Sequence, residues 1–496
     1  MSPKSENGIA MILALFMVMV LSVLSSSLMF VSQTETWSSQ NYRMASQARY
    51  AAESGMHLAS NYLMFTYAPP STGGADDIAN YTYENTSPVL IGGAPVVLSS
   101  NPDVASNYPA AAVAADFAAN VVGNVTLNDI PVAFNATATL LAMQEIVDAA
   151  TGANTTLQTW QIDAEGGITG ARSAEVSVSV VIERQPFPMY SYAAFATGRG
   201  CGAITFAGGA TTDSYDSTGA GPGVPPVPDA YGGNVGANGN LDASGGTTVI
   251  NGSVSSPRGG VGNCTTNNVT ATTLKGATVT DGFTQLSQPI DLEAPPEPNP
   301  LPPTTDDDFI GAGCPASVMA AVCTPTGTGA ILDPAANGGT ITLGNMNLTG
   351  GAEVHLNAGT YVVNSLDFAG GSQIVIDSGP VIFQIAGKDG GGGDLATPVK
   401  MVGNTVSNDT YDPTNLQLFY AGTGELQLAG GAEASALIYA PNASASFSGG
   451  FDFYGAVVVN QLTATGGSTI HYDRNLLNSA FTTSNHQMTS FSWKNF

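Results

Sequence analysis

The stretch that decides the fold is IAMILALFMVMVLSVLSSSLMFV, residues 9–31, which contains no charged side chain. An α-helix rises about 1.5 Å per residue, so this stretch is about 35 Å long as a helix, enough to cross a bilayer core with some tilt. The helical pattern continues to about Phe65, with no proline and no glycine between Gly8 and Gly55. The sequence therefore predicts a long helix over 9–67, in which 9–31 spans a membrane and the rest faces water.

Two simpler interpretations of residues 9–31 are a secretory signal peptide and a single-pass anchor with its N-terminus inside. A signal peptide has a shorter apolar core, a basic front and a cleavage site of small residues. Here the apolar stretch is long, and only Lys4 precedes it, partly offset by Glu6. The pattern disfavours a signal peptide, while the apolar stretch alone leaves the simple anchor open.

Small residues recur along one side of the second half of this helix, at steps of three and four: Ala45, Ala48, Ala52, Gly55, Ala59 and Tyr62. Small side chains let another backbone approach closely, as in tight helix bundles. The seam suits either neighbouring helices or the chain's own globular domain, and the sequence does not choose between them.

Residues 7–15, NGIAMILAL, resemble a prepilin cleavage site, and residues 49–56, RYAAESGM, resemble the N-terminal region of PilX-type minor pilins of type IV pili. The resemblance covers Gly8 to Met64. It implies a leader over 1–8, cleavage between Gly8 and Ile9, an inner-membrane stage with the N-terminus in the cytoplasm, and other pilins as partners of the helix. Major pilins carry glutamate at the fifth position after the cut, where this chain has Leu13, a departure that goes with a minor or tip subunit.

Composition limits the function classes of the 496-residue chain. Its formal net charge is −26 with only 10% charged residues. Phosphate binding needs a cationic face, so nucleic acid is disfavoured as a partner, and the acidic balance fits an exported protein. The four cysteines, Cys201, Cys264, Cys314 and Cys323, are disulfide candidates, since such bonds persist outside the cytoplasm. We favour pairing in chain order, although sequence alone leaves the connectivity open.

Beyond the helix, residues 75–190 predict a small antiparallel β domain of the pilin-like kind. The alternation of Val176, Val178, Val180 and Ile182 is typical of a half-buried strand. Two segments, 110–119 and 140–149, are expected to form short helices. A sheet packed on the second half of the long helix follows from this arrangement.

The chain changes character again after residue 190, where adjacent glycine pairs recur at spacings near twenty, among them Gly350-Gly351, Gly370-Gly371 and Gly449-Gly450. A short period with apolar runs between glycine corners is typical of a solenoid. We expect a right-handed parallel β-helix in two parts, 191–288 and 309–480, followed by a tail over 481–496; a β-sandwich is the alternative. Residues 436–443, 451–456 and 470–473 also resemble a glycine-rich β-helical domain found behind PilX-type N-termini, which implies a surface-exposed head.

A proline-rich and acidic segment, 289–308, separates the two expected parts of the β-helix. It holds seven prolines between Pro289 and Pro303, too many for a strand in the interior of a sheet. Such a segment adopts extended polyproline II structure. It is either a flexible linker or a strap along the outside of the β-helix.

Candidates for chemistry are few. The best constellation is His471, Asp473 and Arg474, which we expect to be an end cap of the last coil, so we name no catalytic residue and predict that the chain is not an enzyme. Calcium is the one cofactor to weigh, with oxygen ligands at Asp213, Asp216, Asp306, Asp307 and Asp308, although none matches the spacing of a known calcium loop.

The sequence therefore predicts a mainly β minor pilin-like subunit that serves pilus assembly or adhesion through an extracellular head, with a surface glycan or protein receptor as its target. The alternative is a membrane-anchored, polysaccharide-active β-helix enzyme or a carbohydrate-binding surface protein. The scarcity of basic residues counts against the enzyme, because cleavage of acidic sugars needs a base near the carboxylates.

Overall fold

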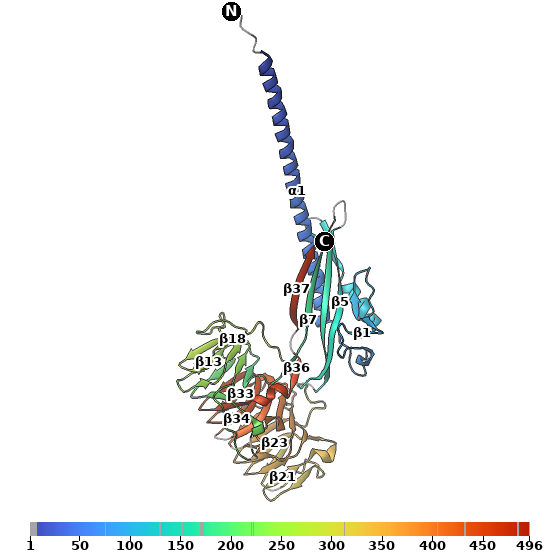
Figure 1. Cartoon of the computed structure of the whole chain (residues 1–496). Coiled ribbons are helices and arrows are strands. Elements are labelled where there is room, and N and C mark those ends of the chain that lie inside the picture. The colour runs from blue at the N-terminus through green and yellow to red at the C-terminus, as the bar shows by residue number, and fades with distance from the viewer. Residues whose placement is uncertain are drawn as a thin grey trace, which may run out of the picture. The chain divides into compact units, whose positions relative to one another are not determined.

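The computed structural model describes residues 7–74, 76–127, 130–149, 152–168, 173–219, 221, 223–311, 313–403, 405–430, 433–483 and 486–495. The chain is mainly β, with one long N-terminal helix and large parallel sheets (Figure 1). It divides into two compact units. Unit 1 comprises Met1–Glu145, Asn154–Gln185 and His486–Phe496; unit 2 comprises Ile146–Ala153 and Pro186–Asn485.

The long helix of unit 1, α1, runs from Asn7 to Phe65 (Figure 1). Its first half is solvent-exposed along its described length, whereas its second half packs on strands β6 and β7. The helix ends at Phe65, shortly before Pro69-Pro70, which cannot continue a helix. The predicted helix and its change from an apolar to an amphipathic half are both found.

The sheet of unit 1 has six strands in the order β3-β5-β6-β7-β37, with β4 paired to β5. Its strands and the smaller elements of unit 1 are β1 Leu90–Ile91, β2 Ala94–Pro95, β3 Val97–Ser99, β4 Gly123–Leu127, β5 Ile130–Val147, β6 Asn154–Ile168, β7 Ala174–Glu183, β37 Gln487–Asn495, the helix α2 Ala111–Asn120 and the 3-10 turn η1 Ile78–Asn80. The described pairings within this sheet are antiparallel. The helix expected over 110–119 is α2.

Two segments of unit 1 differ from expectation. Residues 140–149 were expected to be helical, but residues up to Val147 continue strand β5. Residues 487–495, expected to be part of a tail, form β37 and pair with β7 from Val176 to Glu183. Both differences arise from pairing with strands distant in the sequence, which single-segment patterns do not reveal.

The core of unit 1 lies between the second half of α1 and the sheet. Ala52, Met56 and Ala59 of α1 are buried against Val178 and Val180 of β7. Just past the C-terminal end of α1, the Tyr67 ring meets the Trp160 ring edge-on, with centroids 5.8 Å apart. Aromatic pairs of this geometry add roughly 1 kcal/mol beyond area burial.

Unit 2 contains a 22-stranded sheet, a 5-stranded sheet in the order β20-β21-β24-β27-β30, and the antiparallel pair β8–β36. Within the 22-stranded sheet the strands pair in parallel, and many pair with the strand three positions along the chain, such as β13 with β16 and β25 with β28. The elements of unit 2 are β8 Pro186–Pro188, β9 Ala194–Ala196, β10 Ile204–Phe206, β11 Thr211–Tyr215, η2 Ser217–Gly219, β12 Val235–Ala237, β13 Leu241–Ser244, β14 Val249–Ile250, β15 Val254–Ser256, β16 Thr272–Lys275, β17 Thr278–Val279, β18 Phe283–Gln285, β19 Asp306–Ile310, β20 Cys323–Pro325, β21 Gly329–Leu332, η3 Pro334–Asn337, β22 Thr340–Thr342, β23 Asn345–Thr349, β24 Glu353–Leu356, β25 Gly359–Val363, β26 Ser365–Phe368, β27 Gln373–Ile376, β28 Val381–Ile385, β29 Val399–Val402, β30 Val406–Ser407, η4 Pro413–Asn415, β31 Leu416–Tyr420, β32 Leu426–Ala429, β33 Glu433–Ser448, β34 Asp452–Ala464, β35 Thr469–Asp473, η5 Arg474–Asn478 and β36 Phe481–Thr483.

The glycine pairs lie at corners between these strands. Gly370 and Gly371, between β26 and β27, have φ values of 68° and 74°. This left-handed region is costly for residues with a Cβ, so the corner requires glycine. The pattern that predicted corners in the sequence is therefore confirmed at this position.

The stacking order of unit 2 does not follow the chain. The first strand, β9, pairs with β34 on one side and with β12 on the other, and β11 likewise pairs with both β35 and β14. The first strands therefore extend away from β34 and β35 in one direction, while β19 to β33 approach β34 from the other. The two parts expected from the sequence meet in one sheet, and β35 lies inside the stack (Figure 1).

The proline-rich segment between β18 and β19 crosses from one end of this stack to the other and lies against it. Asn238 forms two hydrogen bonds of 2.8 Å with the backbone of Ile290. Further along, Tyr439 donates a hydrogen bond to the Glu293 carbonyl at 2.6 Å, and Lys388 pairs with Glu297 at 2.7 Å. Of the two alternatives that the sequence left open, these contacts favour the strap over a flexible linker.

Candidate functional site

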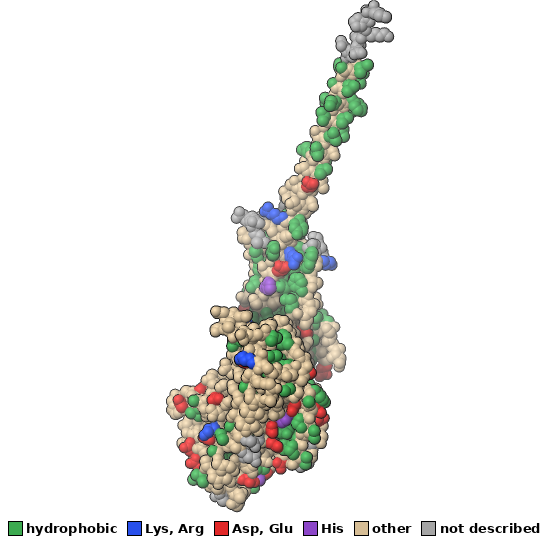
Figure 2. Space-filling view, turned by 90° about the vertical axis from the view of Figure 1, so that its left-hand side faces the viewer, with side chains coloured by type: hydrophobic (Ala, Val, Ile, Leu, Met, Phe, Trp, Pro, Cys, Tyr) green, Lys and Arg blue, Asp and Glu red, His purple; other side chains and the backbone are tan. Residues whose placement is uncertain are grey.

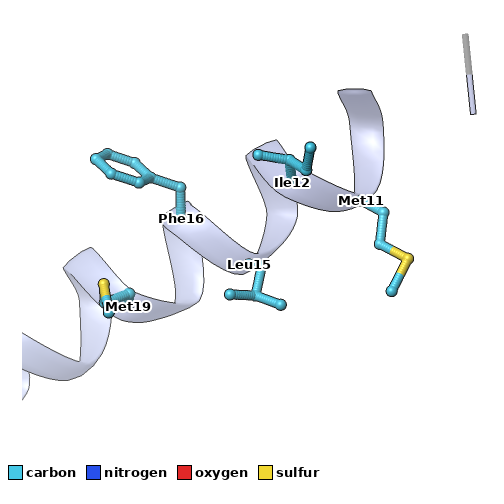
Figure 3. Close-up of a pocket in the computed structure, with 5 residues that line it drawn as sticks. All are labelled: Met11, Ile12, Leu15, Phe16 and Met19. Atoms are coloured by element: carbon cyan, nitrogen blue, oxygen red, sulfur yellow. The ribbon is translucent and has the colours of Figure 1, made fainter. Parts of the chain in front are cut away.

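The exposed apolar half of α1 is the most distinctive surface of unit 1. Ile9, Leu13 and Phe16 are 68%, 65% and 66% exposed, and the hydrophobic side chains follow the free part of the helix in Figure 2. Figure 3 shows Met11, Ile12, Leu15, Phe16 and Met19 projecting from this part of the helix with no other element beside them. An apolar surface of this size in water is unfavourable by about 25 cal/mol per Å², so the segment requires a membrane or other helices around it.

Among the described residues, α1 is the one helix long and apolar enough to cross a membrane. The expected cleavage point, Gly8–Ile9, lies in its first turns. Leu13 is on the exposed surface, where the glutamate of a major pilin would offer a carboxylate to a neighbouring amine. An apolar side chain at this position cannot make that ion pair.

The seam of small residues lies on the chain's own sheet. Ala48, Ala52 and Ala59 are fully buried. A Cβ on Gly166 of β6 would overlap the Ala48 carbonyl oxygen and lie 2.5 Å from the Ala52 nitrogen. Of the two accounts that the sequence left open, the seam from Ala48 to Ala59 therefore serves packing on the chain's own sheet, and α1 approaches β6 closely at Ala48 and Ala52.

The constellation His471, Asp473 and Arg474 lies at β35 and the start of η5, in the interior of the stack. The expectation of an end cap is wrong, because β11 covers β35 on the side away from β34. The first strands of unit 2 dock there from a distant part of the sequence. The three side chains contact different partners, and they do not converge on one point.

His471 is buried between two carboxylates, with Nδ1 bonded to Asp213 at 2.5 Å and Nε2 3.7 Å from Asp452, while its ring stacks on Tyr454. Burial lowers its pKa, but the hydrogen bonds and charges of Asp213 and Asp452 outweigh burial and raise the pKa to about 9. The imidazole is therefore protonated at neutral pH and has no lone pair to act as a general base. The geometry describes a structural ion cluster that joins β11, β34 and β35.

This cluster predicts a pH dependence of the stability of unit 2. The folded pKa of His471, about 9, lies above the ordinary value of 6.5, so its contribution is complete below about pH 6.5 and is lost as pH rises toward 9. The loss amounts to about 3 kcal/mol. Urea unfolding of the full chain in detergent, followed at pH 6.5 and 9, measures it.

The control for this prediction is His471→Gln, which carries no titrating group at this position. We expect this variant to be less stable at pH 6.5 and to lose the pH dependence between 6.5 and 9. If the free energy of unfolding changed equally with pH in the variant and in the unchanged chain, a group other than His471 would be responsible for the pH dependence.

The neighbours of His471 are also engaged. Asp473 accepts hydrogen bonds from the Ser217 hydroxyl at 2.7 Å and the Asn475 amide at 2.9 Å. Arg474 pairs with Asp229 at 2.7 Å. These contacts tie the segment after β11 to η5.

The calcium candidates occupy separate places. Asp213 holds His471, and Asp216 accepts hydrogen bonds from Thr218 and Asn475, which lower its pKa. Asp306 and Asp308 accept from Asn345 and Asn347, whereas the buried Asp307 accepts from the Gly344 backbone on the other face of the strand. Over the described part of the chain, no group of three or more His, Cys, Asp or Glu side chains is arranged to hold a metal ion.

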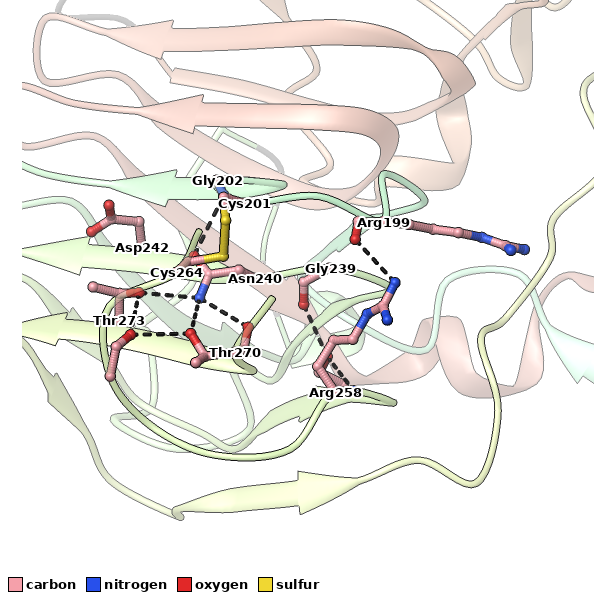
Figure 4. The surroundings of a disulfide bond; sticks show 12 residues. Arg199, Cys201, Gly202, Gly239, Asn240, Asp242, Arg258, Cys264, Thr270 and Thr273 are labelled. Atoms are coloured by element: carbon pink, nitrogen blue, oxygen red, sulfur yellow. Dashed lines mark hydrogen bonds between the residues drawn. A yellow bond between two sulfur atoms is a disulfide. The ribbon is translucent and has the colours of Figure 1, made fainter. Parts of the chain in front are cut away.

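The four cysteines form Cys201–Cys264 and Cys314–Cys323, the pairing favoured from chain order. Figure 4 shows the first bond joining the turn before β10 to the loop that precedes β16. Asn240 supports the same loop, with its Nδ2 donating to the Thr270 carbonyl at 3.0 Å and to the Thr273 hydroxyl at 3.2 Å. The loop is thus held both covalently and by a buried amide.

A polar pocket of about 170 Å³, which no sequence pattern indicated, lies beside β27, β30 and the start of β33. It is lined by Gln373, Val406, Ser407, Asn408, Asp409, Tyr411, Glu433 and Ser435. Ser407 donates to Asp409 at 2.7 Å and Tyr411 donates to Glu433 at 2.7 Å, so the two carboxylates are already positioned by hydroxyl groups. The positive φ of 52° at Tyr411 is a feature that the sequence did not reveal. The residues that line the pocket come from three separate repeats, which explains why no local sequence motif indicated the pocket.

Comparison with known proteins gives two matches to family models. Residues 7–57 match the PilX N-terminal family, and residues 362–479 match a domain of unknown function (DUF7305). No curated protein matches the chain. A similar solved structure is that of the competence-associated pilin ComZ from Thermus thermophilus, with 16% identity over 91% of this chain and 98% of that chain, and a TM-score of 0.25, which is too low to support an argument about the fold.

Proposed function

We propose that this chain, whose residues 7–57 are a PilX-type N-terminal region, is a minor pilin-like subunit of a type IV pilus. The observation that carries the proposal is the division of α1 into an exposed apolar half and a half packed on the sheet of its own unit. Such a helix can lie in a bilayer before assembly and among neighbouring helices afterwards, because both surroundings remove its apolar surface from water.

Unit 2 is proposed to be the extracellular head of this subunit, built as a right-handed parallel β-helix. The parallel pairing of strands three positions apart and the glycine corners support this interpretation. The oxidised cysteine pairs fit a location outside the cytoplasm. For this head we propose a role in adhesion to a surface glycan or protein, or in pilus assembly.

A structural, non-enzymatic role is favoured by the site geometry. His471 is held protonated by Asp213 and Asp452. The described residues that line the polar pocket include no lysine, arginine or histidine. Cleavage of a polysaccharide needs an acid and a base near one bond. His471, held as a cation in its ion cluster, cannot be that base, and both carboxylates of the pocket already accept hydrogen bonds from hydroxyl groups.

The N-terminus of the mature chain tests the proposal. We expect mass spectrometry of the protein from sheared surface filaments to find a chain that begins at methylated Ile9, because a prepilin-type peptidase cuts between Gly8 and Ile9. The matched control is Gly8→Val, which should leave an intact Met1 and keep the chain in the membrane fraction. A mature chain that begins near Ser27, or absence of the chain from filaments, would contradict the proposal.

A further inference from the structure

Strand β37 is the outermost strand of the sheet in unit 1, and it is exposed on both faces. It ends the strand order β3-β5-β6-β7-β37, and no strand in the described part of the chain pairs with its outer side. Nine residues in extended form are about 30 Å long. Long unprotected edges of this kind promote pairing with another chain, so proteins normally shorten, cover or charge them.

The side chains of β37 are apolar on one face. Met488, Phe491 and Trp493 are 52%, 45% and 51% exposed. Phe491 and Trp493 pair across the strands with Val180 and Val178, which face the core beneath α1. Cross-strand partners share a face, so these side chains continue the core face of the sheet past the helix.

The strip formed by Met488, Phe491 and Trp493 lies directly beside α1. The Arg49 guanidinium sits over the Trp493 ring, 5.1 Å from its centroid. At the other end, Met488 pairs with Ile182, which pairs in turn with Trp160, whose ring contacts Tyr67. The strip therefore adjoins the helix that makes the pilin interface and runs antiparallel to it.

We propose that β37 is a docking edge for an extended strand of a second, different pilin that is anchored in the same membrane. The inference rests on the proposed function. The outer side of β37 offers main-chain hydrogen bonds, and its apolar side chains offer anchors at alternate positions, the two elements of strand addition. The partner strand would carry apolar residues on the side that faces α1, where they cover Phe491 and Trp493.

The direction of α1 argues against a second copy of this chain that pairs through its own β37. Two copies paired through this edge in the antiparallel, two-fold manner would reverse the strand and, with it, the helix that runs antiparallel to the strand. Their apolar halves would then point in opposite directions, and one membrane could not hold both. A different pilin can present a strand of either direction while its own helix lies parallel to α1.

Photo-crosslinking in cells that make the full chain tests this proposal. A benzophenone amino acid replaces Met488, and the matched control places it at Asn124, an exposed residue on β4 at the opposite edge of the sheet. We expect an adduct at position 488 whose second chain, identified by mass spectrometry, has its own apolar N-terminal helix. An adduct with a second copy of this chain, an adduct with a protein lacking such a helix, or no adduct would overturn the proposal.

Charge substitutions make the test specific for the apolar face. With the crosslinker at position 488, Phe491→Asp should reduce the adduct by about tenfold or more, as expected for an anchor residue. Ser492→Asp puts the same charge on the opposite face of the strand and should change the yield by no more than about twofold. Equal losses of adduct in the two variants would overturn the assignment of the face.

Filament content is measured in the same cells. Filaments that contain the chain without its adduct contradict only this inference, whereas absence of the chain from filaments contradicts the proposed function as well.

Discussion

Replacing Gly166 by valine is expected to separate the second half of α1 from its sheet. A Cβ at this position would overlap the Ala48 carbonyl oxygen and lie 2.5 Å from the Ala52 nitrogen, both backbone atoms of the helix. Neither atom can move by a rotamer change, so the helix must shift and uncover the core around Met56 and Ala59. We expect the free energy of unfolding of unit 1 to fall by about 4 kcal/mol or more, which is beyond the usual range for a point substitution.

The measurement is hydrogen exchange of peptides from residues 43–65 in the full, detergent-solubilised chain, where the loss should speed exchange by about a thousandfold. Gly167→Val is the matched control. It is the next residue of the same strand, a Cβ there meets no atom within 4 Å, and valine favours strands. Similar exchange in the two variants would mean that the helix does not depend on contact at Gly166.

Removing the Cys201–Cys264 bond is expected to have the second large effect. The bond closes a loop with a sequence separation of 63, against 9 for Cys314–Cys323. In the loop-entropy description, the longer loop contributes about 4 kcal/mol and the shorter one about 2.5 kcal/mol. The double substitution Cys201→Ala with Cys264→Ala should therefore destabilise unit 2 more than the same change at Cys314 and Cys323.

Urea unfolding of the two variants and the unchanged chain measures this difference. We expect the midpoint to fall in both variants, with the larger shift for the Cys201 and Cys264 pair. The loop before β16 should also become more accessible to proteases, because hydrogen bonds alone would still hold it, among them those from Asn240 and Thr270. A larger shift for the Cys314 and Cys323 pair would contradict the argument from loop length.

Several features were predictable because a local pattern encodes them. The apolar stretch 9–31, the alternation of Val176 to Ile182 and the glycine corners each report a period or a backbone requirement within a few residues. β37 was also within reach, since Phe491 and Trp493 alternate with Ser490 and Ser492. Proximity to the chain's end made that segment look like a tail.

Residues 140–149 show why other features were not predictable. Leucine, alanine, methionine and glutamate favour a helix in isolation. In the fold, Leu140 is fully buried, and its backbone bonds to Val89 and Val96. Pairing with these residues outweighs a preference worth only tenths of a kcal/mol per residue. The polar pocket and the partners of His471 were hidden for the same reason, since each joins segments far apart in the chain.

The sequence by itself determined that this protein has a bilayer-compatible helix, a mainly β body, glycine corners and an acidic composition, because periodicity, composition and backbone freedom can be read from the residues themselves. Tertiary structure alone decided that the small-residue seam packs on β6, that β9 docks on β34, and that the proline-rich strap crosses the stack. These outcomes depend on which distant strands find complementary registers and how closely their backbones approach. Such contacts are settled by the packing of the whole chain, and no single segment encodes them.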